Sequence, residues 1–355
     1  HRQTAYKLYR ELVAPLEPLF AGKKVLFTAT SGALQSLPLS VLVTDPPPGN
    51  DTDSAMLAET HWLIDKYALV TLPAVSSLKT LRCFPLDSSI PVHAGCSANG
   101  PGEGGSHQAT LDFAGIGNPV LNGKTEDRGH RGTEDSSYYS RGEVADVDRL
   151  RDLPALPGTE TELKTVASYF PSGAAVLRLG PEATETEVKH DADIGRARIV
   201  EFATHALIAD EKERIGEPGL VLTPPKTATA EDDGLLSASE VAQLHLSADF
   251  VVLSACNTAR KDGKLGADGL AGLARAFFYA GARSMLVSNW SISDQATPEL
   301  MHQIFAAMKN NPAAGRAVAF RDGIEKTKSN TQWREPRYWA PFVLVGDTDE
   351  RPGPG

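Results

Sequence analysis

The sequence predicts an α/β fold in which helices cover both faces of a mainly parallel β-sheet. The chain has 355 residues, which is enough to bury a large core. From residue 152 onward, short apolar runs alternate with segments that carry apolar residues at helical spacing. The apolar runs are almost continuous, as expected for parallel strands that are buried on both faces.

The first 150 residues contain fewer predicted elements than the rest of the chain. Apolar periodicity predicts a helix over 1–20, strands over 23–29, 67–72 and 111–119, and a helix over 76–82. Residues 84–110 are rich in Pro, Gly and Ser, and residues 121–150 are polar and charged. We expect both segments to be flexible, exposed loops.

The second part of the chain contains regularly alternating elements. We predict strands over 174–179, 197–206, 248–258, 282–290 and 340–346, separated by helices over 159–170, 184–190, 237–244, 270–280 and 297–310. Three of these helices begin at Ser/Thr-x-x-Glu capping boxes, which start at Thr159, Thr184 and Ser237. Thr297 and Pro298 suit the N-cap and first positions of the last helix. Gly281 suits the C-terminal cap of the helix before it.

Composition narrows the class of protein. The net charge of −10 and the pI of about 5.4 argue against a general nucleic-acid-binding surface. No run approaches the roughly 18 apolar residues of a membrane-spanning helix, and no signal peptide is recognisable. The sequence begins with His-Arg-Gln, so we expect a fragment of a longer protein. The three cysteines lack C-x-x-C spacing, which disfavours disulfides and zinc and favours the cytoplasm.

Two of the predicted strands end at chemically reactive side chains. FATHALI ends its apolar run at His205, and VVLSACNTA ends its run at Cys256. Because sites in parallel sheets form at the carboxyl ends of strands, we expect the two residues to lie side by side. A buried cysteine is more often a small apolar residue, and a histidine at this position can be purely structural.

A cysteine and a histidine at adjacent strand ends are suited to peptide hydrolysis. The thiolate attacks the carbonyl carbon and the imidazole protonates the leaving amine. The backbone N–H groups of Ala206 and Cys256 are our candidates for the oxyanion hole. No phosphate loop, G-x-S-x-G or H-E-x-x-H motif occurs, and the other histidines show no metal-ligand spacing. We therefore predict neither a cofactor nor a metal.

These residues sit within longer motifs that are similar to the CHAT family, caspase-like peptidase domains that often follow tetratricopeptide (TPR) repeats and are related to caspases and separases. The similar segments are Gly32–Leu42, His61–Leu81, Gly115–Pro119, Leu153–Leu163, Glu201–Ile208, Asp233–Leu244, Val251–Ala259, Gly266–Thr297 and Tyr338–Asp347. The combination of SACNT with SNW is the most specific part of the resemblance.

The resemblance implies a caspase-like three-layer sandwich with a His205–Cys256 dyad that cleaves protein substrates. It also implies a supporting, pseudo-protease-like half over 1–150 and a catalytic half over 151–355. The residues it implies for the substrate cleft are Ser288, Asn289, Trp290 and Asp294, and two acidic residues after the cysteine, Asp262 and Asp268, are further candidates.

The sequence departs from the family pattern in two places. The family often has glycine after the histidine, where this chain has Ala206. Ser254 stands where some Arg-specific relatives carry an acidic residue, so that position does not support Arg or Lys specificity. We expect a peptidase that stays latent until an upstream TPR or other sensor region, or a partner, activates it. The alternative is a catalytically silent scaffold for protein–protein interaction.

Overall fold

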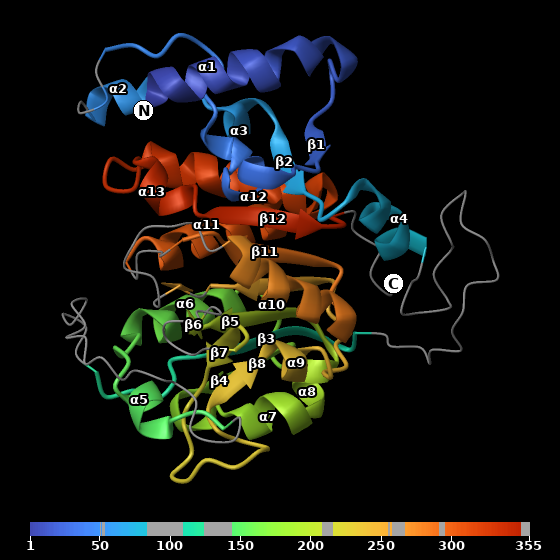
Figure 1. Cartoon of the computed structure of the whole chain (residues 1–355), viewed down its shortest axis with the longest axis vertical. Helices are drawn as coiled ribbons and strands as arrows, with labels where there is room; N and C mark the ends of the chain where they lie inside the picture. The colour runs from blue at the N-terminus through green and yellow to red at the C-terminus, as the bar shows by residue number, and fades with distance from the viewer. Residues whose placement is uncertain are drawn as a thin grey trace.

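The fold is built on one eight-stranded sheet, seen in the computed structural model of the chain (Figure 1). The structure describes residues 1–49, 51, 54–83, 109–123, 144–207, 216–254, 256–257, 267–290 and 295–348. The strands of the sheet, in spatial order, are β1 (Val25–Thr28), β2 (Ala68–Thr71), β12 (Phe342–Gly346), β11 (Ser284–Ser288), β9 (Phe250–Leu253), β5 (Ala197–Ala203), β3 (Leu111–Gly117) and β4 (Ala175–Leu179).

Neighbouring strands in this sheet are parallel except at one junction. The antiparallel pair is β11 with β12, which divides the sheet into two parallel groups. Every residue of β9 and β11 is buried, and six of the seven residues of β5 are buried. Strands buried on both faces read as continuous apolar runs, which is why the sequence locates them well.

Helices cover both faces of the sheet, as predicted. On one face, α6 (Pro157–Ala167), α11 (Thr297–Asn310) and α12 (Gly315–Ser329) contribute to a core shared with Ile199 and Val252. The helices on the other face are α7 (Glu185–His190), α8 (Ala192–Gly195), α9 (Ala238–Val241) and α10 (Ala267–Ala280), which share a core with Val200 and Phe202. The strand residues alternate between the two cores. The predicted mainly parallel, three-layer sandwich is confirmed.

The N-terminal residues extend the same sheet. Figure 1 shows α1 (Arg2–Leu12), β1 and β2 at one end of the long axis, and β4 with α7 at the other. β3 also precedes residue 151, yet it pairs with β4 and β5 from the second half. The two predicted halves therefore share one sheet. The supporting, pseudo-protease-like role of residues 1–150 stays a prediction. Most of the two predicted loops, residues 84–108 and 124–143, lies outside the described residues.

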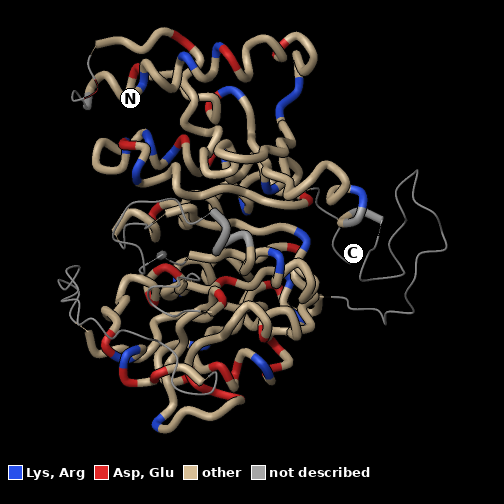
Figure 2. Tube along the Cα trace, viewed as in Figure 1, with Lys and Arg blue, Asp and Glu red and all other residues tan. Residues whose placement is uncertain are grey.

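Short helices complete the described structure. They are α2 (Ser54–Ala58), α3 (Leu63–Lys66), α4 (Val75–Cys83), α5 (Val147–Arg151), α13 (Pro336–Trp339), η1 (Ala14–Leu19), η2 (Gly32–Ser36), η3 (Leu39–Val41), η4 (Gly180–Glu182) and η5 (Pro312–Ala314). Figure 2 shows charges of both signs interspersed over helices and loops. No helix within the described ranges has the length and apolarity needed to cross a bilayer.

The three predicted capping boxes are confirmed only in part. Ser237 and Glu240 form the predicted reciprocal capping box, and the Thr184 side chain accepts from the Glu187 N–H. The capping box at Thr159 is wrong, because α6 begins two residues earlier at Pro157 and Leu156 is its N-cap. The Thr159 hydroxyl instead donates to the Leu156 carbonyl and accepts from the Asn118 N–H.

Two further predictions concern helix ends. α11 begins at Thr297, so its N-cap is Ala296 and not Thr297. A helix start shifts by one residue when the cap residue itself adopts helical backbone angles, as Ala296 does here. Gly281 follows the last residue of α10 with a φ of 117°, a conformation that glycine reaches without strain. The prediction of a C-terminal cap at Gly281 is confirmed.

Candidate active site

A second, smaller sheet continues from two central strands of the large one. It has four strands in the order β10 (Cys256–Asn257), β6 (His205–Leu207), β7 (Gly219–Val221) and β8 (Leu235–Ser237). β6 follows β5 after one residue, and β10 follows β9 after two. The small sheet therefore grows out of the carboxyl ends of neighbouring parallel strands, where sites in such folds form.

The backbone pairing places His205 and Cys256 side by side. Ile199 pairs with Phe250 in the large sheet, and His205 pairs with Cys256 in the small one. The offset is 51 residues in both sheets, so the register continues through the break between them. Neighbouring strands lie about 4.8 Å apart. The predicted adjacency of the two strands is confirmed.

β6 is held firmly on its other side. Its three residues pair with β7, and the Thr204 hydroxyl donates a hydrogen bond to the Val221 carbonyl. Leu207 is fully buried in a small core with Val221 and Leu235. His205 thus lies on a strand that is fixed from both edges.

The ring of His205 has a defined hydrogen-bond partner. Its Nε2 lies 2.7 Å from the carbonyl oxygen of Pro154. A carbonyl oxygen can only accept, so Nε2 carries the hydrogen and donates it. In the neutral ring, the lone pair is then on Nδ1, which makes Nδ1 the atom able to take up a proton. His205 itself is 2% exposed.

The family model for the CHAT domain matches residues 2–347. The chain belongs to the CHAT domain family. This confirms the family expected from the motifs. No residue role follows from the match by itself.

Two relatives of this CHAT domain are the mouse and human proteins named Tetratricopeptide repeat protein 28. The mouse protein is 26% identical over 319 residues and the human protein 25% over 316. Each alignment covers 81% of this chain but only 11% of the relative. The activities and partners of the whole relatives therefore do not transfer to this chain.

Two solved structures resemble this chain at low similarity. The Arg-specific cysteine proteinase gingipain R matches with a TM-score of 0.46 and 11% identity, over 98% of this chain and 66% of its own. The separase–securin complex of Saccharomyces cerevisiae matches with a TM-score of 0.39 and 13% identity, over 80% of this chain and 14% of the other. Scores this low support no inference about the site of this CHAT domain.

The structure places only some of the predicted cleft residues. Ser288 is the buried last residue of β11, the neighbour of β9. The Asn289 N–H donates to the Pro341 carbonyl, and Trp290 packs partly buried against the core under α11. Asp262 and Asp294 lie outside the described residues. Asp268 falls in the first turn of α10, but its side chain is outside the described part.

Ala206 occupies an ordinary strand position. It lies between Leu220 of β7 and Asn257 of β10. Among the described residues other than glycine, only Asn118 has a positive φ. The substitution of alanine for the common glycine therefore causes no backbone strain at position 206. That the Ala206 and Cys256 N–H groups form an oxyanion hole stays a prediction.

Pro154 is the site residue that the sequence did not reveal. It lies 51 residues before His205 and contributes only its backbone carbonyl. A carbonyl has no residue-type signature, so no motif could mark it. The segment LPALPG stands out in the sequence only as part of the family pattern.

Two neighbouring carboxyl groups are buried between α6 and β5, the strand that leads to His205. Glu201 on β5 is completely buried, and Glu162 on α6 is 2% exposed. Burial raises the pKa of Glu201 well above its ordinary value, and the neighbouring Glu162 carboxyl raises it further. The uncharged form of Glu201 is therefore the one that the folded protein favours.

The raised pKa of Glu201 predicts that the stability of the folded protein depends on pH. The folded protein holds a proton that the unfolded chain releases at lower pH, so the free energy of unfolding falls as pH rises above the ordinary glutamate value. The slope for one proton is at most about 1.4 kcal/mol per pH unit. Glu201→Gln should flatten this slope in urea titrations between about pH 5 and 9, whereas exposed Glu182→Gln should not. Equal slopes in the wild type and Glu201→Gln would show that protonation of Glu201 does not cause this pH dependence of the stability.

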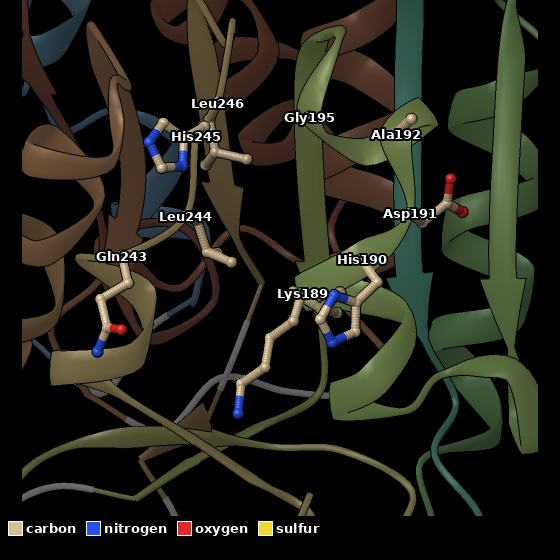
Figure 3. Close-up of a pocket in the computed structure, with 10 residues that line it drawn as sticks. Lys189, His190, Asp191, Ala192, Gly195, Gln243, Leu244, His245 and Leu246 are labelled. Carbon is tan, nitrogen blue, oxygen red and sulfur yellow. The ribbon is translucent and has the colours of Figure 1, made fainter. Parts of the chain in front are cut away.

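A pocket of about 190 Å³ lies away from these strands. Lys189, His190 and Asp191 line it from one side, and Gln243 and His245 from the other (Figure 3). The Lys189 Nζ already contacts the carboxylates of Glu185 at 2.5 Å and Glu240 at 2.8 Å. The pocket contains no residue of β6 or β10, so it is not part of the candidate active site. No cluster of metal-binding side chains occurs within the described ranges.

Proposed function

We propose that this CHAT domain is a cysteine endopeptidase with His205 and Cys256 as its catalytic dyad. The observation that carries the proposal is the backbone register, which pairs His205 with Cys256 at the carboxyl ends of two central strands. Membership of the CHAT family supports the same reaction class.

The hydrogen bond to Pro154 supports a specific division of labour. With hydrogen on Nε2, Nδ1 is the ring atom that accepts the thiol proton of Cys256 in this proposal. The thiolate attacks the peptide carbonyl and forms a tetrahedral intermediate. The imidazolium then returns the proton to the leaving amine, and water hydrolyses the acyl-enzyme. The N–H groups of Ala206 and Cys256 are the proposed donors to the oxyanion.

The substrate in this proposal is a protein segment that binds across the carboxyl ends of β9 and β11. Ser288 ends β11 at that edge, and Asn289 and Trp290 come directly after it. Asp262, Asp268 and Asp294 remain proposed cleft residues. An upstream TPR or sensor region would hold the enzyme latent in a reducing cytoplasm. The names of the mouse and human relatives support association with such repeats.

The burial of His205 keeps the second candidate function open. A side chain that is 2% exposed fits a latent peptidase, and it equally fits a scaffold without turnover. The two candidates differ in the reactivity of Cys256, because a thiolate next to a base is alkylated faster than an ordinary thiol.

The deciding experiment compares the wild type with Cys256→Ala on a library of proteome-derived peptides. We expect cuts that are absent from the Cys256→Ala sample, and the residues before those cuts would define the specificity. If neither sample cuts, dilute iodoacetamide separates the candidates. Faster labelling of Cys256 than of Cys83 and Cys96 would identify a latent enzyme, and equal or slower labelling would identify a scaffold.

A further inference from the structure

Gly123 lies against the segment that carries the partner of His205. Gly123 forms an isolated parallel bridge with Pro154. Its N–H donates to the Leu153 carbonyl at 3.1 Å, and its carbonyl accepts from the Ala155 N–H at 3.2 Å. Both chain neighbours of Pro154 are thus bonded to one residue.

The bridge determines the direction of the Pro154 carbonyl. Successive carbonyls of an extended segment point to opposite sides. Because the Leu153 carbonyl and the Ala155 N–H face Gly123, the Pro154 carbonyl faces away from it, toward His205. Proline has no N–H. Pro154 therefore presents its carbonyl oxygen to His205 as an acceptor and has no N–H that could compete as a donor.

The bridge leaves no room for a side chain at position 123. A Cβ on Gly123 would lie 2.2 Å from the Asp152 carbonyl oxygen and 2.6 Å from the Leu153 carbonyl oxygen. Real Cβ atoms do not approach backbone atoms so closely, so any larger residue must displace the segment 152–155. The approach requires glycine.

The segment around Pro154 shares a small hydrophobic core with the strand that carries His205. Leu153 and Leu121 flank the bridge and are buried in the same small core as Leu207, two residues after His205. The Asn122 N–H also donates to the Arg151 carbonyl at 2.7 Å. Because Leu121, Leu153 and Leu207 share this core, we expect a displacement at Gly123 to disturb the packing around the strand that carries His205.

We propose that Gly123 is a positioning residue for His205. Through the bridge to Pro154, it holds the imidazole with hydrogen on Nε2 and the lone pair on Nδ1. The expected effect of Gly123 on peptide cleavage rests on the proposed peptidase function, whereas its expected effect on the His205 tautomer does not.

The test compares Gly123→Ala with Gly216→Ala, whose added Cβ would have no atom within 4 Å. Histidine labelled with ¹⁵N in the ring reports the tautomer by NMR, and His205→Gln assigns its signal. We expect hydrogen on Nε2 in the wild type and in Gly216→Ala. Gly123→Ala should lose that preference and show a changed pH titration of His205. The tautomer can be measured whether or not the protein cleaves peptides.

If the protein cleaves peptides, Gly123→Ala should also lower kcat by about 10²-fold with little change in KM, as for a small misplacement of a reacting group. If Gly123→Ala does not fold, Ala155→Pro removes one of the two bridge hydrogen bonds and leaves Gly123 itself unchanged, and the same loss of the Nε2–H tautomer is expected. An unchanged tautomer and titration in a folded variant of either kind would overturn the proposal.

Discussion

Replacing His205 by glutamine is expected to lower kcat by about 10³-fold, within the range that a general acid–base group supplies. Glutamine retains an N–H donor that can reach the Pro154 carbonyl, so the contact at 2.7 Å can persist. It has no atom that accepts and returns the proton of the thiol. The variant therefore removes the base and keeps the local hydrogen bond. Steady-state kinetics on the peptide identified with the library give the measurement.

The matched control for this variant is His190→Gln. His190 is an exposed residue on α7 whose ring contacts Glu231. We expect His190→Gln to cleave at the wild-type rate. If His205→Gln kept more than about a tenth of the wild-type kcat while folding normally, His205 would not be the base that the dyad requires.

Replacing Arg283 by methionine is expected to cost about 3–5 kcal/mol in the free energy of unfolding. The Arg283 Nη2 lies 2.7 Å from the Asp347 Oδ2, and the two side chains are 7% and 0% exposed. Methionine fills much of the space but removes the guanidinium that faces a buried carboxylate. An uncompensated charge in a dry environment is the main cost. Urea denaturation, monitored by tryptophan fluorescence, measures the change.

The double variant Arg283→Met/Asp347→Leu distinguishes lost charge pairing from lost packing. Because it removes both charges, we expect it to recover most of the stability that Arg283→Met loses. Arg321→Met is the surface control, since Arg321 pairs with a partly exposed Asp322 and should cost less than about 1 kcal/mol. A loss below about 1 kcal/mol for Arg283→Met would show that the buried ion pair contributes little.

The strands of this CHAT domain could be predicted because their signals are local. β5, β9 and β11 are continuous apolar runs, and such runs follow from burial on both faces. The capping box at Ser237 also depends only on residues three apart in sequence. The capping box at Thr159 failed because α6 begins earlier, at Pro157, and the Thr159 hydroxyl instead accepts from Asn118, which is 41 residues away.

The environment of the candidate site could not be predicted to the same extent. His205 and Cys256 were recognisable from their residue types at strand ends and from the family motifs. The contacts that orient His205 come from Pro154 and Gly123, which act through backbone atoms and through the absence of a side chain. Neither property produces a pattern in a single sequence.

The sequence alone determined the α/β class, the CHAT family and the two strands that carry His205 and Cys256, because each depends on residue type and on short-range periodicity. Only the tertiary structure decided the 51-residue register that pairs the two residues, the inclusion of the N-terminal strands in the same sheet, and the tautomer of His205. These features depend on hydrogen bonds between backbone groups far apart in the chain. Backbone N–H and C=O groups are the same in nearly all residues, so no pattern in the sequence shows which of them will pair in the folded chain.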